Sequence, residues 1–293
     1  MGAARTSIES IPQPGAIDHV FYVLRSNPVT MAAFGMLAVL LLAALAGPSI
    51  VPYDPLTTNA AKALQPPSFE HWFGTDNLGR DVFSRVVIAT RLDLTISVAA
   101  VMLSLVIGSL LGAFAGYWGG WIDAVLNRVL DTIMAFPLFV LAMGIVAALG
   151  NTIENIIYAT AIINIPFYAR LVRAEVNIRR EAGFALAAKL AGNSDLRVLA
   201  FHIFPNALPP MMVQVSLNLG WAILNASGLS FIGLGVRPPT AEWGIMVAEG
   251  ANFIVSGEWW LAVFPGLALI LAVFTFNLLG DGLRDMVDPR RRT

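Results

Sequence analysis

Six long apolar segments, separated by polar stretches, constrain the fold of this chain more than any other feature. Each is near or above the roughly 20 residues that an α-helix needs to cross the hydrocarbon core of a bilayer. A helix satisfies its backbone hydrogen bonds within the span, so it is the structure that such segments adopt in lipid. The sequence therefore predicts six membrane-spanning helices, at residues 29–51, 92–118, 129–149, 153–171, 208–234 and 259–279.

The composition supports an all-α membrane protein and excludes several other classes. Only 13% of the 293 residues are charged and 57% are hydrophobic, whereas about a quarter of a soluble domain is charged. The chain has no cysteine, which excludes disulfides, thiolate metal sites and a cysteine nucleophile. The net charge of −1 provides no basic field that would attract nucleic acid.

The positive charges predict the orientation of the spans. If the N-terminus is cytoplasmic, 13 of the 18 Lys and Arg residues lie on cytoplasmic segments, and the other five are Lys62, Arg80, Arg85, Arg91 and Arg237. Basic residues favour the cytoplasmic side, so both termini are predicted to be cytoplasmic, including the basic tail 288–293. Residues 44–46 resemble a signal-peptide cleavage site, but the length and late start of this apolar run favour a retained span.

A polar, helix-forming segment separates the fourth and fifth spans on the cytoplasmic side. Residues 184–191 are rich in Ala and Leu, which favour a helix, and Gly192 suits its C-terminus because glycine adopts a positive φ freely. A second helix is predicted over 195–204, with Pro205 ending it and Asn206 capping the next span. The segment is either an amphipathic connector on the membrane surface or a docking element for a cytoplasmic partner.

The predicted second helix has its own signals. Asn193 or Ser194 can cap its N-terminus. The spacing of Leu196, Leu199 and Ile203 places these three side chains on one face of the helix. The residues before and after Gly192 therefore predict two short helices at an angle to each other.

The loop at residues 52–90 is predicted to lie outside the cytoplasm. Asp76 or Asn77 can cap a short helix that runs through Ser84 and Arg85. The loop is either an amphipathic segment on the membrane surface or part of the mouth that receives a solute. The candidate residues for the second alternative are Asp76, Arg80, Asp81 and Arg85.

Other candidate sites are few. His19, His71 and His202 are too far apart in sequence and topology to form a three-histidine metal site. Asp131, near the start of the third span, is expected to pair with Arg128 on the same helix. Prolines inside the predicted spans indicate either packing kinks or gating hinges, and they are Pro137, Pro166 and Pro265.

Several motifs resemble those of ABC import permeases. The spacing Ala187-Ala188-x3-Gly192-x11-Phe204-Pro205 is similar to the EAA loop of that family, with Leu186 in place of the family's glutamate. The segments 27–28, 52–55, 74–85, 115–123, 228–239, 259–266 and 277–285 resemble its peptide/nickel branch. The resemblance covers nearly the whole chain, and its motifs occur in the expected order.

The resemblance implies a type I ABC importer permease fold of six transmembrane helices, with a cytoplasmic coupling helix between spans four and five. It divides the chain into 1–90, with the first span and outer loop, and 91–293, a five-span core with coupling loop 176–206. The residues implied to contact an ATPase are Leu186, Ala187, Ala188, Lys189, Gly192, Asp195, Arg197, His202 and Pro205. We expect Gly192→Pro or a charge at Ala188 to uncouple ATP hydrolysis from transport.

The same resemblance implies a non-enzymatic C-type subunit in a bacterial inner membrane. Its expected partners are a homologous second permease, two ATPases that hold ATP and Mg²⁺, an extracytoplasmic binding protein and membrane lipid. The chain is expected to bind no cofactor or metal itself, and neither of its two lysines follows a glycine as in a phosphate-binding loop. The expected solutes are di- or oligopeptides, with nickel, glutathione or opine-like compounds as alternatives, and an ion-coupled carrier or channel as the alternative class.

Overall fold

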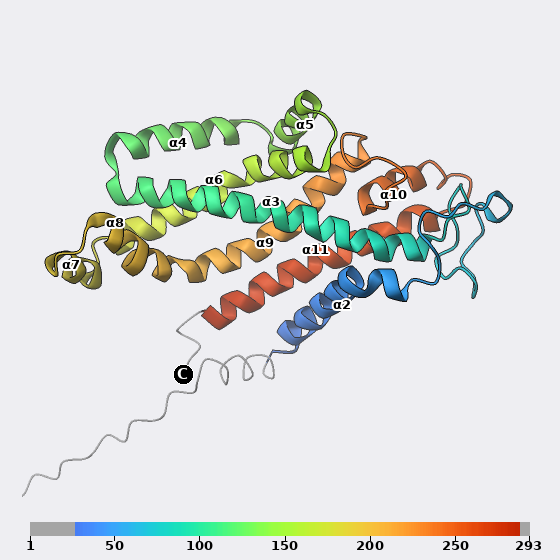
Figure 1. The fold of residues 1–293 in the computed structure, drawn as a ribbon, viewed down its shortest axis with the longest axis horizontal. Helices are drawn as coiled ribbons and strands as arrows, with labels where there is room; N and C mark the ends of the chain where they lie inside the picture. Colours follow the sequence, from blue (N-terminus) through green and yellow to red (C-terminus); the bar gives the residue numbers. More distant parts are fainter. Residues whose placement is uncertain (1–26, 288–293) are drawn as a thin grey trace, which may run out of the picture.

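The computed structural model describes residues 27–287 of the chain. Within that range the secondary structure is helical, and Figure 1 shows an elongated bundle. The predicted cytoplasmic tails and His19 lie outside the described residues. The elements are α2 (Pro28–Ile50), η1 (Ala60–Lys62), α3 (Val82–Trp118), α4 (Gly120–Ala135), α5 (Leu138–Leu149), α6 (Ile153–Arg179), α7 (Gly183–Leu190), α8 (Asp195–Arg197), η2 (Val198–Ile203), α9 (Phe204–Phe231), α10 (Trp243–Ala251) and α11 (Trp260–Val287).

The described helices confirm an all-α fold with membrane spans. Five are long and apolar enough to cross a bilayer, and α4 with α5 makes a sixth if that bent pair is one span. The predicted third span was wrong as a single straight helix, because α4 and α5 meet at 89°. Pro137 disfavours helical geometry at Phe136, which is extended there (φ −88°, ψ 146°). Pro166 and Pro265 remain inside α6 and α11.

Three predicted boundaries also need correction. The second span begins at Val82 rather than at residue 92, because Asp81 caps the helix well before the apolar run starts. The fourth span continues to Arg179 rather than ending at residue 171. The sixth span likewise continues to Val287 rather than ending at residue 279. All three helices therefore extend past the apolar runs that predicted them.

The contact between α3 and α6 is the most extensive between two helices of the described bundle. Gly108, Gly112 and Gly116 follow one another at four-residue spacing along α3 and face the α6 backbone. A Cβ atom on Gly112 would lie 2.3 Å from the Ala169 carbonyl oxygen, and one on Gly116 would lie 2.6 Å from that of Arg173. Glycines let helix backbones approach closely in membranes. The contacts advance in the same direction along both helices, so α3 and α6 run parallel.

A second group of helices packs beside this pair. Helices α2 and α11 lie side by side and enclose an apolar core together with parts of α3 and α10. Asn27 caps α2, accepting from the Val29 and Thr30 amides at 3.0 and 3.3 Å. Its side-chain amide also donates to the Asp285 carboxylate at 3.4 Å. This contact joins the start of the first span to the end of the last.

The two ends of the bundle carry different structures. Figure 1 shows α7 and α8 at one end, and the 51–81 loop with α10 at the other. The basic segment that the charge distribution assigned to the cytoplasm lies at the first end. The loop assigned to the opposite side lies at the second end, so the helix order agrees with the predicted alternation of sides.

We predict that Gly112→Ala destabilises the protein. The added methyl group would overlap the Ala169 carbonyl, and overpacking of this kind costs about 1–3 kcal/mol. The control is Gly144→Ala in α5, where a Cβ would meet nothing within 4 Å. Thermal unfolding of both purified variants is the measurement, and a Gly112→Ala midpoint equal to that of Gly144→Ala would contradict the assigned contact.

Candidate functional site

The turn after α7 has the geometry predicted for it. Gly192 adopts a φ of +85°, and its amide donates to the Lys189 carbonyl at 2.9 Å. Asn193 then donates twice to the Ala188 carbonyl, from its backbone amide at 3.3 Å and from its side chain at 2.9 Å. Asn193 thus completes the end of α7, while Ser194 occupies the cap position of α8 without a side-chain hydrogen bond.

The prediction that the second short helix ends at Pro205 was wrong. Helix α8 passes through the π-helical turn η2 directly into α9, and Pro205 lies in the first turn of α9. Pro205 has no amide hydrogen to donate, and the π-helical turn directly before α9 is where the regular hydrogen bonding of the helix changes. Asn206 does not cap the span, because its side-chain amide donates to the His202 carbonyl at 2.7 Å. The loop is therefore mechanically continuous with the fifth span.

The inner side of the loop packs on the bundle. Ala188 is buried, as are Leu199 and Ile203. Leu196 is exposed, so the prediction that it shares a face with Leu199 and Ile203 was wrong. The π-helical turn changes the angular position of successive residues, which explains the difference. The buried cluster draws on α3, α6, α7, η2 and α9, and its members are Ala113, Tyr117, Val172, Val176, Ala185, Ala188, Val198, Leu199, Ile203, Ala207 and Met211.

A polar clamp fixes the loop to the end of α3. The Tyr117 hydroxyl donates to the Asp195 carboxylate at 2.6 Å. Lys189 donates to the same oxygen at 3.0 Å, and its ammonium lies 5.1 Å from the centroid of the Tyr117 ring. The hydrogen bond to Asp195 raises the pKa of Lys189, so this lysine is charged at neutral pH. Tyr117, Lys189 and Asp195 hold α7, α8 and α3 together.

The outer side of the loop exposes large apolar side chains. We call these residues the outer apolar face: Phe184, Leu186, Leu190, Leu196 and Phe201. Leu190 is 91% exposed. Exposed apolar clusters on a polar side of a protein mark contacts with other molecules. Of the residues predicted for docking, Leu186 belongs to this face, the exposed Ala187, Gly192, Arg197 and Pro205 lie on the same loop, and His202 is half-buried.

The sequence prediction missed most of this face. It identified Leu186 but not Phe184, Leu190 or Phe201. The signal was present, because residues 184–201 contain more large apolar side chains than one buried stripe requires. A helix that is apolar on two sides has two surfaces to cover.

Two ion pairs attach α4 to α6 near the loop. Arg170 donates to Asp131 at 2.5 Å, and Arg173 binds Asp123 through both carboxylate oxygens. The predicted pairing of Asp131 with Arg128 was wrong. Arg170 on the neighbouring helix α6 pairs with Asp131 instead.

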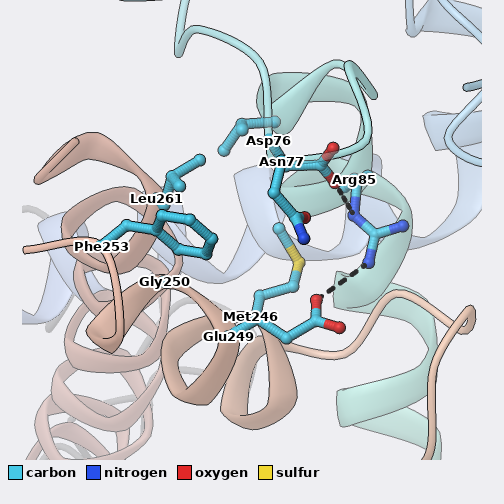
Figure 2. Close-up of a pocket in the computed structure, with 9 residues that line it drawn as sticks. Asp76, Asn77, Arg85, Met246, Glu249, Gly250, Phe253 and Leu261 are labelled. Carbon is cyan, nitrogen blue, oxygen red and sulfur yellow. Dashed lines mark ion pairs between the residues drawn. The ribbon is translucent and has the colours of Figure 1, made fainter. Parts of the chain in front are cut away.

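The candidate residues of the outer loop meet in one buried network. Asp76 accepts from the Leu78 and Arg80 amides, both at 2.9 Å, and from the Arg80 guanidinium at 2.6 Å. Figure 2 shows Arg85 between the carboxylates of Asp76 and Glu249, at 3.7 and 4.0 Å. Arg80 and Arg85 are each 2% exposed. The two arginines and the two carboxylates compensate one another where the loop meets α3 and α10.

Asp81 has the capping role that the sequence assigned to Asp76 or Asn77. One of its oxygens accepts from the Ser84 amide and hydroxyl at 2.8 and 2.7 Å. The other lies 2.8 Å from His71 Nδ1. Asp76 instead stabilises the turn before the helix by accepting from backbone amides. An aspartate in a turn and an aspartate at a helix cap look alike in a sequence. The cavity in Figure 2 has a volume of only about 20 Å³, too small for a peptide.

The sequence prediction also missed two buried carboxyl groups. Glu242 caps α10, accepting from the Gly244 and Ile245 amides at 2.9 and 2.8 Å. Asp93 accepts from the Trp243 amide at 3.2 Å. An acidic residue within a predicted span indicates a specific role. Asp93 lies within the predicted span 92–118, so the sequence did contain this signal. Together these groups fasten α10 to α3.

Comparisons with known proteins agree with this geometry. Residues 108–293 match the family described as binding-protein-dependent transport system inner membrane component. Residues 17–67 match the N-terminal transmembrane domain of oligopeptide transport permease C.

Individual relatives match over most of their length. A dipeptide transport system permease protein of Alkalihalophilus pseudofirmus is 42% identical over 273 residues, which cover 93% of this chain and 90% of the relative. A probable D,D-dipeptide transport system permease protein of Escherichia coli is 42% identical, with coverage of 92% and 90%. A glutathione transport system permease protein of E. coli is also 42% identical, with coverage of 91% and 88%. The chain therefore belongs to the family of binding-protein-dependent transport permeases, multi-pass proteins of the inner membrane.

Proposed function

We propose that this permease forms half of the translocation path of an ATP-driven importer of short peptides. The peptide assignment rests on the dipeptide permeases that are 42% identical over more than nine-tenths of the chain. Glutathione, itself a tripeptide, belongs to the same solute class, and a relative named for it is equally similar. An ion-coupled carrier is the less favoured alternative, because the matching family and the similar permeases are named as parts of binding-protein-dependent or dipeptide transport systems.

The proposed assembly contains four kinds of partner. A homologous second permease completes the path, two ATPases hold ATP and Mg²⁺, and an extracytoplasmic binding protein delivers the solute. Membrane lipid surrounds the spans. We further propose that the chain divides into residues 1–90, with the first span and the outer loop, and a five-span permease core of residues 91–293. The separate family matches to 17–67 and 108–293 support this division.

The outer apolar face carries the proposal, because it is the surface that we expect an ATPase to cover. Exposed Leu190 would occupy a pocket on that partner, with Leu186 replacing the polar contact of the family's glutamate. The inner face and the Tyr117–Lys189–Asp195 clamp transmit movement of the loop to α3 and α6. The continuous connection through η2 transmits it to α9. ATPase closure would then move these helices as a rigid body between inward-open and outward-open states.

At the other end of the bundle, we propose that the outer loop forms the solute-receiving mouth. Asp76, Arg80, Asp81 and Arg85 shape that mouth from within, since all four side chains are buried. Their charges hold the loop in one conformation, so that the binding protein meets a preformed surface. In this proposal these residues position the mouth without contacting the solute.

We predict that Leu190→Asp uncouples transport from ATP hydrolysis. A charge in a buried interface position costs at least the roughly 2 kcal/mol of a hot spot, so uptake should fall about tenfold or more. The measurements are peptide uptake and peptide-stimulated ATP hydrolysis by the complete transporter in proteoliposomes. Ala188 is less suitable than Leu190, because a charge there would also disrupt the buried cluster.

The control for Leu190→Asp is Val255→Asp. Val255 is 98% exposed at the opposite end of the bundle, so the same change should leave uptake and hydrolysis unaltered. Normal uptake by Leu190→Asp would refute the docking assignment. Transport of peptides without any ATPase would refute the proposed energy source.

We predict that Arg80→Ala destabilises the outer loop far more than Lys62→Ala. Removing one partner of a buried ion pair costs about 3–5 kcal/mol, and Arg80 is buried between Asp76 and Glu249. Lys62 forms an exposed pair with Glu70, and such pairs contribute about 0–1 kcal/mol. Protease cleavage of the loop in intact spheroplasts is the readout, and equal cleavage of the two variants would contradict the prediction.

A further inference from the structure

An apolar groove lies on the outer half of α3, outside the network of buried charges. Its volume is about 420 Å³. The walls come from three segments distant in sequence: the chain after α2, the second to fourth turns of α3, and the loop before α10. The lining residues are Pro55, Leu56, Ile88, Arg91, Leu92, Thr95, Pro239, Thr240 and Ala241.

The groove is held in shape by buried groups behind it. The Arg85 guanidinium donates to the Pro55 carbonyl at 3.2 Å and to the Pro239 carbonyl at 3.3 Å. It therefore ties together two walls that lie far apart in the sequence. Trp243 fastens the second wall to α3, because its indole donates to the Val86 carbonyl at 3.0 Å. A groove fixed in this way is preformed, as ligand sites generally are.

The groove contains one positive charge, on Arg91. This side chain is exposed, and no salt bridge to it is found among residues 27–287. The Thr95 hydroxyl donates to the Arg91 carbonyl at 2.6 Å, so that hydroxyl is already engaged. A ligand that complements this surface has a long apolar part and an anionic group beside it. A guanidinium binds phosphate oxygens with two parallel hydrogen bonds.

The position of Arg91 along α3 points to the membrane itself as the source of the ligand. Arg91 and Trp118 lie about 40 Å apart at 1.5 Å per residue, close to the 40–45 Å thickness of a bilayer with its headgroups. Trp118 lies beside the Tyr117 clamp at the cytoplasmic end, so Arg91 lies at the level of the outer headgroups. Exposed Val98 and Met102 continue the apolar surface from the groove towards the membrane interior.

We propose that this groove binds one phospholipid of the outer leaflet, with its phosphodiester on Arg91 and an acyl chain against the apolar walls. Basic groups beside apolar grooves between spans are suited to lipid headgroups. The lipid would fill the space between the chain after α2, α3 and the loop before α10. It would thereby brace the outer mouth on its membrane side. This site depends on membrane embedding and not on the identity of the transported solute.

Native mass spectrometry of the complete transporter tests the site, with phosphatidylglycerol as the probe. Arg91→Gln removes the charge and should lower lipid occupancy roughly tenfold. Leu56→Trp keeps the charge but fills the groove, and it should lower occupancy to a similar extent. Arg237→Gln is the matched control, because Arg237 is exposed on the same loop as Pro239 but does not line the groove. Peptide uptake measured in parallel separates failure of this site from failure of the proposed transport function.

The absence of cysteine allows a second measurement without background labelling. A single Thr240→Cys variant carrying a photoreactive group should cross-link to phosphatidylglycerol, and Arg91→Gln should abolish that product. Excess inorganic phosphate should not compete, since it lacks the acyl chain. Equal occupancy in the wild type, Arg91→Gln and Leu56→Trp would overturn the proposal. Competition by inorganic phosphate alone, or a cross-link to the second permease instead of lipid, would overturn it as well.

Discussion

The backbone contact between α3 and α6 is the constraint on which the rest of the structure depends. Three glycines at four-residue spacing let the two helices run parallel in direct contact. Parallel neighbours in one chain require a return segment, and α4 with α5 provides it, attached to α6 by Asp123–Arg173 and Asp131–Arg170. The ends of α3 and α6 then form the platform for the cytoplasmic loop. Any larger residue at Gly112 would separate the two helices and move this platform.

Each end of the α3–α6 pair is finished by polar groups that serve different purposes. At the cytoplasmic end, Tyr117, Lys189 and Asp195 fix a loop whose outer side stays apolar and exposed. At the outer end, buried arginines pair with carboxylates and hold separate chain segments in one conformation. In the function proposed above, a partner would move the first end, and the second end would resist distortion. This asymmetry suits a permease that receives a solute on one side and mechanical force on the other.

Sequence reasoning succeeded where a local rule decides the outcome. Apolar runs predicted the spans, and Gly192 predicted the end of α7. The assignment of the two ends from the charge distribution stays a prediction. It failed where a neighbour in space competes with a neighbour in sequence. Asp131 pairs with Arg170 on another helix instead of Arg128, and Pro205 continues a helix that it was expected to end. The candidate charges of the outer loop do lie close together, but their burial and mutual pairing were not visible in the sequence.

The sequence by itself determined that this is an all-α membrane protein and which family it belongs to, and its charges predict which side of the membrane each loop faces. Those properties follow from hydrophobicity, charge and motif order, which depend only on the order of residues in the chain. The tertiary structure alone decided which side of the coupling loop is free, how the outer charges compensate and where a preformed groove lies beside Arg91. Each of these depends on residues brought together from separate helices, and burial and pairing energies depend on distance in space and not on separation in the chain.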